Sequence, residues 1–159
     1  MWIKLIGFLA SGLSARLIPQ SEESKHVAFV REKVEKNDSR FELHEVTTPD
    51  GYILQVFHLF SDNPNEAIEP VLMWHGLFQD AGAWIFNAKN PGVKPPALEA
   101  VDNSLDIWLG NSRGTLYSSK HMHLDKDDVE HRNKFWDFSW SDIGQHDLPT
   151  VINYVNEYT

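Results

Sequence analysis

Cysteine is absent from the 159 residues of this chain. Disulfide bridges and thiolate metal sites are therefore excluded, and the redox compartment stays undetermined. Basic residues are also scarce, because 14 Lys and Arg stand against 23 Asp and Glu, for a formal net charge of −9. Nucleic-acid binding relies on clustered Lys and Arg, so this balance argues against a nucleic-acid partner.

No apolar run at the N-terminus is long enough to span a bilayer, since the run at 5–10 covers six residues. It follows Lys4 and precedes small residues that end at Ala15. This layout is typical of a secretory signal peptide, so residues 1–15 are predicted to be a signal or targeting segment. A secreted, lysosomal or endomembrane location would follow. The alternative is an apolar first strand or helix of the domain.

The chain does contain a short apolar stretch at 71–74, placed between Pro70 and the pair His75-Gly76. Such a stretch predicts a buried strand in a mostly parallel sheet that helices cover on both faces. Loops at the carboxyl ends of these strands are where α/β enzymes place their chemistry. A backbone N–H there could stabilise a developing oxyanion. The alternative is an ordinary core strand that ends in a turn.

The remaining pattern is that of one α/β domain, which suits the length of the chain. Two β-rich runs at 41–48 and 52–60 flank Pro49-Asp50-Gly51 and predict a hairpin. Further predicted elements are a helix within 21–36, a helix at 97–100, a buried strand at 106–110, a polar loop at 111–138 and a helix over 141–158. The sequence ends after this last helix without a strand to receive the crossover, so we expect an incomplete fold.

One serine motif invites a catalytic interpretation. Gly110-Asn111-Ser112-Arg113-Gly114 matches the G-x-S-x-G pattern of a nucleophile elbow and follows a predicted strand. The elbow also needs a helix directly after the serine. The next residues, 115–119, are typical of a strand or loop, so we interpret Ser112 as a loop residue and not as a nucleophile.

Histidines raise the question of a metal. The H-x-H-x-D pattern at 121–125 resembles a metal-binding cluster, but it would need further ligands such as His131 or His146. The acidic residues within and after it favour a solvated loop instead. His44 and His58 stand singly in predicted strands, where surface or half-buried positions are expected.

Several motifs occur in the order found in one family. They are the segment 45–54, His75-Gly76-Leu77, Trp84, the segment 106–114, the segment 135–139 and Asp147-Leu148-Pro149. With these residues the chain, over 26–158, resembles the N-terminal half of the acid lipase family, the gastric and lysosomal type of α/β-hydrolase. The resemblance implies an α/β-hydrolase fold, with a hairpin and parallel strands flanked by helices, and assigns residues 21–159 to the N-terminal portion of a lipase domain.

The resemblance also implies a function. Members of the family hydrolyse carboxylic esters of lipids, such as triacylglycerols and sterol esters, with a Ser-Asp-His triad and no cofactor or metal. The backbone N–H of Leu77 matches a donor of the oxyanion hole, and His75 and Gly76 shape that loop. In the family the nucleophile follows the helix to which Asp147 belongs, so we expect the triad to lie outside this chain and the chain alone to be inactive.

Two other hypotheses stay open. The first is a non-catalytic fragment that binds a lipid surface or a partner through exposed apolar residues. The second is a metal-dependent hydrolase that uses His121 and His123.

Overall fold

The computed structural model describes residues 14–61, 70–86 and 92–159. Most of the predicted targeting segment, residues 1–13, lies outside the described residues, as does most of the loop before the strand at 70. Within the described ranges, no helix combines the length and the hydropathy that crossing a membrane requires.

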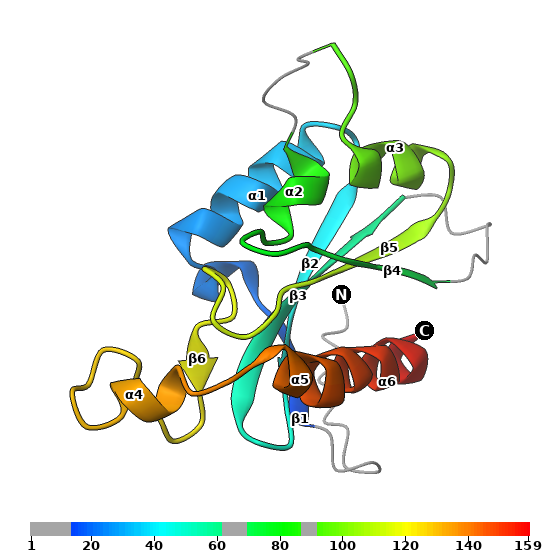
Figure 1. The fold of residues 1–159 in the computed structure, drawn as a ribbon. Coiled ribbons are helices and arrows are strands. Elements are labelled where there is room, and N and C mark those ends of the chain that lie inside the picture. The colour runs from blue at the N-terminus through cyan, green and yellow to red at the C-terminus, as the bar shows by residue number, and fades with distance from the viewer. Residues whose placement is uncertain (1–13, 62–69, 87–91) are drawn as a thin grey trace.

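A mixed sheet of six strands forms the centre of the fold (Figure 1). Its order is β1-β2-β3-β5-β4, and β6 pairs with β3 beside this path. Among the strands that the structure describes, only β4 and β5 pair in parallel, and the other pairs are antiparallel. The strands are β1 (Ser14–Ile18), β2 (Arg40–Thr47), β3 (Tyr52–Phe60), β4 (Pro70–Trp74), β5 (Asp106–Gly110) and β6 (Lys120–His121). Together with the flanking helices, the sheet confirms the predicted α/β class.

The predicted hairpin is the pair β2–β3, in which Thr47 lies opposite Ile53 and Arg40 opposite Phe60. Gly51 turns the chain with a φ of 98°, a backbone conformation that glycine adopts without a steric penalty. Strand β1 was not predicted. It pairs with β2, so the sheet includes residues before the expected domain start at 21.

Helices cover both faces of the sheet (Figure 1). On one face, α1 (Lys25–Glu35), α2 (Gly82–Ile85) and α3 (Pro96–Asp102) contribute to a first apolar core. On the other, α6 (Leu148–Tyr158) and α4 (Arg132–Phe135) pack on a second core around Trp108. The two cores alternate along each strand because successive side chains point to opposite faces.

Three sequence predictions need correction. Strand β4 was predicted to be buried, yet its residues are all partly exposed. The reason is its place in the strand order: in the described part of the chain it pairs with β5 alone. The predicted loop at 111–138 contains β6 and α4. The predicted C-terminal helix is divided into α5 (Trp140–Asp142), a π-helical turn (Ile143–Asp147) and α6, with Pro149 in the first turn of α6.

Candidate active-site loop

The loop at 75–78 leaves the carboxyl end of β4. Strand β5 runs parallel to β4, with Trp74 opposite Gly110, so the segment that follows β5 emerges beside this loop. The carboxyl edge of parallel strands is the usual place for a ligand site in an open α/β sheet. The structure therefore brings His75 and Ser112, which are 37 residues apart in the sequence, into contact.

His75 ties the two loops together. Its Nε2 accepts a hydrogen bond from the backbone N–H of Ser112 at 3.0 Å, and its Nδ1 lies 2.9 Å from the carbonyl oxygen of Gly76. An amide can only donate and a carbonyl can only accept. The ring consequently accepts at Nε2 and donates from Nδ1, and it links the loop to the segment that follows β5.

The backbone amides of the loop differ in whether they have a hydrogen-bond acceptor. The N–H of Gly76 donates to the side-chain oxygen of Gln79 at 3.1 Å, and Gln79 returns its own N–H to the Gly76 carbonyl. No described residue accepts a hydrogen bond from the N–H of Leu77. Leu77 is 58 % exposed and Phe78, with a φ of 58°, is 97 % exposed. The N–H of Phe78 likewise has no acceptor among the described residues, so the loop presents two free backbone donors, at Leu77 and Phe78, next to an apolar, solvent-facing surface.

Ser112 lies in a turn beneath this loop. Its Oγ accepts a hydrogen bond from Trp74 Nε1 at 2.9 Å, and its carbonyl accepts from the Thr115 hydroxyl at 2.8 Å. The residue is buried. A turn and not a helix follows it, as predicted from the sequence, so the support that an elbow serine requires is missing from this position.

Gly110 explains how the Trp74 ring fits between the two loops. A Cβ atom at position 110 would lie 2.2 Å from Cζ3 of Trp74, well inside van der Waals contact. The hydrogen bond to Ser112 fixes the ring in place. The first glycine of the G-x-S-x-G pattern, Gly110, therefore leaves the space in which the Trp74 indole ring packs.

Arg113 is the centre of an ion-pair cluster that sequence reasoning missed, in which Arg113 and Asp147 are buried and Asp50 is exposed. Its guanidinium contacts Asp50 through Nη1 at 2.6 Å and Nη2 at 3.0 Å, and its Nε donates to Asp147 at 2.7 Å. The second oxygen of Asp147 accepts the Arg113 amide at 2.9 Å, and the guanidinium lies over the Tyr52 ring at 4.0 Å. This Arg113 cluster (Arg113, Asp50, Asp147 and Tyr52) joins the hairpin turn, the end of β5 and the start of α6.

Burial and pairing act in opposite directions on the two carboxylates of the cluster. Burial would raise the pKa of Asp50, but the hydrogen bonds from Arg113 outweigh it and hold this pKa below its ordinary value. Asp147 is more deeply buried, and its desolvation raises its pKa despite Arg113. Both carboxylates are paired with Arg113, so the cluster is suited to a structural role.

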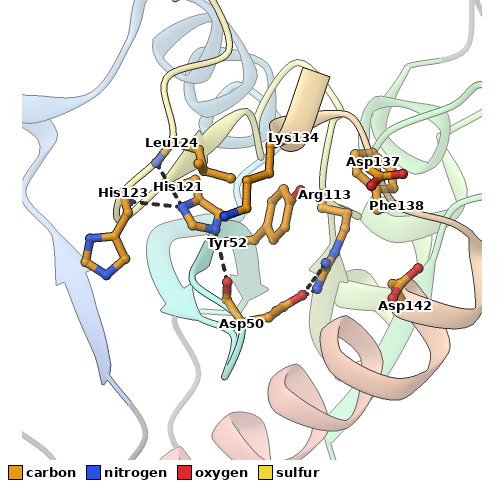
Figure 2. Close-up of a pocket in the computed structure, with 10 residues that line it drawn as sticks. All are labelled: Asp50, Tyr52, Arg113, His121, His123, Leu124, Lys134, Asp137, Phe138 and Asp142. Atoms are coloured by element: carbon orange, nitrogen blue, oxygen red, sulfur yellow. Dashed lines mark hydrogen bonds and ion pairs between the residues drawn. The ribbon is translucent and has the colours of Figure 1, made fainter. Parts of the chain in front are cut away.

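A polar pocket of about 410 Å³ opens beside the cluster (Figure 2). Asp50, Arg113, His121, His123 and Lys134 contribute to its lining. The Nε2 of His121 contacts the carbonyl of Asp50 at 3.0 Å, and its Nδ1 accepts from the amides of His123 and Leu124. Both ring nitrogens are thus engaged by the backbone. Among the described residues, no group of metal-ligating side chains forms around His121 and His123.

Comparison with known proteins gives consistent matches. Residues 30–88 match the family model described as the partial alpha/beta-hydrolase lipase region. "Lipase 1" of Drosophila melanogaster is 39% identical over 118 residues, which are 74% of this chain and 24% of that protein. "Gastric triacylglycerol lipase" of Rattus norvegicus is 38% identical over 120 residues, 73% of this chain and 29% of that protein.

The mouse protein of the same name, from Mus musculus, is 32% identical over 169 residues. That match takes in 100% of this chain and 40% of the mouse protein. The chain therefore spans between a quarter and two fifths of the length of these relatives.

Proposed function

The chain belongs to the acid lipase family of α/β-hydrolases, whose N-terminal region it matches, and on this premise we propose that it contributes the oxyanion side of a lipid ester hydrolase. The observation that carries the proposal is the free N–H of Leu77 at the carboxyl end of β4. Hydrolysis begins when a nucleophile adds to the ester carbonyl carbon and places negative charge on the carbonyl oxygen. A backbone N–H aimed at that oxygen stabilises the charge.

The surroundings of Leu77 support this role. Oxyanion donors act best when they are held in place before the reaction, because no reorganisation is then needed as charge develops. His75 supplies such support through its bond to Ser112, and Gln79 braces Gly76 from the other side. His75 and Gly76 act as positioning residues, and Leu77 as the donor.

Ser112 has a structural role in this proposal. Its hydroxyl is buried and accepts a hydrogen bond from Trp74, and among the described residues no histidine nitrogen is hydrogen-bonded to it, since the neighbouring His75 Nε2 accepts from the Ser112 amide instead. An acyl-enzyme at Ser112 would need an adjacent base. We expect that Ser112 does not catalyse hydrolysis of p-nitrophenyl butyrate. Ser112→Ala should therefore leave the rate of the purified 159-residue chain unchanged. Turnover that this substitution abolishes would contradict the assignment.

The names of the relatives support a proposed substrate class. Two are named gastric triacylglycerol lipase, and the proposal for this chain is a triacylglycerol or sterol ester presented at a lipid surface. The apolar side chains of Leu77 and Phe78 face solvent beside the proposed donor, where an acyl chain or an interface would contact them. A secreted or lysosomal location, with a targeting segment at 1–15, belongs to the same proposal.

A chimera tests the proposed function. Residues 26–159 replace the matched segment of the rat gastric lipase, and hydrolysis of tributyrin and p-nitrophenyl butyrate is measured. We expect a folded, active enzyme, since the loop and its supports would be supplied by this chain. A chimera that melts cooperatively near the temperature of the parent lipase but hydrolyses neither ester would contradict the proposal.

The alternative function is non-catalytic binding to a lipid surface, and the near-complete exposure of Phe78 favours it. Measurements on variants of the chimera distinguish the two functions. A purely interfacial role predicts vesicle binding that depends on Phe78 together with hydrolysis that does not depend on the Leu77 amide.

A further inference from the structure

A second polar cluster lies at the other end of the hairpin, away from the 75–78 loop. Glu42 and His44 are on β2, and His58 is on β3, where it lies directly opposite Glu42. The three side chains share one face of the sheet, since alternate residues of a strand point the same way. His44 and His58 were expected singly at surface or half-buried positions, but both are buried, because α6 covers this face.

The atoms of this cluster converge on one point. The Nδ1 of His58 lies 3.1 Å from Oε2 of Glu42, and the Nε2 of His44 lies 3.4 Å from the same oxygen. The three ligand atoms all fall within 4.8 Å of one another. Atoms bound at about 2.0–2.1 Å to a tetrahedral zinc ion are about 3.3 Å apart, so the two separations between Glu42 and the histidines are close to those of a coordination sphere, and the two histidine nitrogens would move toward each other around the ion.

The independent observation is an unused nitrogen. His44 is fully buried, and its Nε2 has no hydrogen-bond partner. A buried polar atom without a partner costs free energy and is rare in folded proteins. This nitrogen points at the Glu42 carboxylate, so a cation between them would satisfy it.

We infer that Glu42, His44 and His58 form a binding site for a divalent transition-metal ion of the zinc class. Two imidazole nitrogens and one carboxylate oxygen are a typical donor set for such an ion, and neutral imidazole disfavours Mg²⁺ and Ca²⁺. The Glu42 side chain is 29% exposed and gives the ion a path from solvent. A water molecule would complete the sphere on that side.

The groups behind the ligands fit the same role. The far nitrogen of His58 lies 2.5 Å from Asp106, and the far nitrogen of His44 lies 2.7 Å from the Tyr154 hydroxyl. Metal-binding histidines commonly donate their second N–H to a carboxylate or another acceptor, which fixes the ring orientation. Asp106 is itself held by the indole N–H of Trp108 at 2.9 Å.

The inferred ion is structural. It would join β2 to β3 and, through Tyr154, bind the sheet to α6. The site lies at the opposite end of the hairpin from Asp50, and it uses no residue of the 75–78 loop. The inference therefore stands apart from the proposed hydrolase, and either can fail without the other.

Metal binding to the full 159-residue chain tests the inference. Protein freed of metal by chelation is titrated with Zn²⁺ by calorimetry, and its melting is followed with and without the ion. We expect one ion per chain and a rise in Tm of about 5–10 °C when Zn²⁺ is at about a hundredfold its Kd. Co²⁺ in the same site should give the strong visible absorption of a four-coordinate ion.

Variants locate the ion. Glu42→Gln and His44→Gln keep the side-chain size approximately and should weaken Zn²⁺ binding at least about tenfold. The double variant His121→Asn/His123→Asn is the matched control and should bind like the parent chain. If a cluster variant does not fold, the Co²⁺ spectrum and the Zn²⁺-dependent Tm of the parent chain still decide the question.

Three results would overturn the inference. The first is the lack of a stoichiometric ion, which would leave the cluster as a hydrogen-bonded network. The second is binding unaffected by Glu42→Gln and His44→Gln. The third is binding lost in the His121/His123 control, which would place the ion in the polar pocket.

Discussion

The Arg113 cluster and the 75–78 loop lie at the same region of the sheet, yet they use their polar groups in opposite ways. The Arg113 side chain is 1% exposed, and both carboxylates around it are paired with its guanidinium. The loop is exposed and leaves the N–H of Leu77 without a partner. A saturated cluster stabilises a fold, whereas an unpaired donor is available to a substrate. The contrast separates the scaffold from the candidate site.

The largest expected effect on stability comes from Arg113→Met. The substitution leaves Asp147 buried without its cation, and breaking a buried ion pair in this way typically costs about 3–5 kcal/mol. Urea unfolding followed by circular dichroism measures the change. Arg132→Met, at an exposed position of α4, is the control and should alter the free energy of unfolding little. Equal effects of the two substitutions would show that the cluster does not support the fold.

Gly110→Ala tests the packing that joins the two regions. The new Cβ would overlap the Trp74 ring, which the Ser112 hydroxyl holds in place, so we expect a loss of about 1–3 kcal/mol, the usual cost of overpacking. Gly144→Ala is the matched control, because nothing lies within 4 Å of its added Cβ. Thermal melting compares them. A Gly110→Ala variant as stable as Gly144→Ala would contradict the inferred contact.

Asp50→Asn should change how stability depends on pH. Because the folded pKa of Asp50 lies below its ordinary value, this carboxylate stabilises the fold above about pH 4 and loses that contribution as the pH falls through the folded pKa. The parent chain should therefore exceed the variant in Tm at pH 6, and the gap should close in strong acid. A gap that stays constant from neutral to acid pH would contradict the pairing of Asp50 with Arg113.

The smallest effect on stability is expected for Phe78→Ser, since the side chain is almost fully exposed. Its effect should appear in vesicle flotation instead. Transfer of a phenylalanine side chain from water is worth up to about 1.5–3 kcal/mol, so partial insertion predicts a severalfold drop in lipid binding. Val129→Ser, in an exposed turn before α4, is the control. Equal losses for both variants would remove Phe78 from the lipid-contacting surface.

Local patterns in the sequence account for what could be predicted. The hairpin follows from two β-rich runs around a Pro-Asp-Gly turn, and the parallel pair β4–β5 follows from two short apolar runs. Strand order is a tertiary property, so the partial exposure of β4 at the end of that order was not predictable. Strand β1 was missed because it begins inside the expected targeting segment at 1–15 and continues through residues 16–18, which were assigned to no element.

The site was predicted only in part. The position of Leu77 came from its place in a family motif, and its role as a donor stays a prediction. The Arg113 cluster was missed because its carboxylates are 63 and 34 residues away in the sequence. The only signal was a single arginine between a serine and a glycine at a strand end. His44 and His58 were missed for the same reason, since only the hairpin register places them around Glu42.

The most direct test of the central claim compares two substitutions at Leu77 in the rat lipase chimera. Leu77→Pro removes the backbone N–H, whereas Leu77→Ala keeps it. We predict that kcat for p-nitrophenyl butyrate falls about 10²–10³-fold in the proline variant, the usual effect of losing one oxyanion donor, and little in the alanine variant. Equal kcat values in two variants that melt at the same temperature would contradict the claim that the Leu77 amide stabilises the oxyanion.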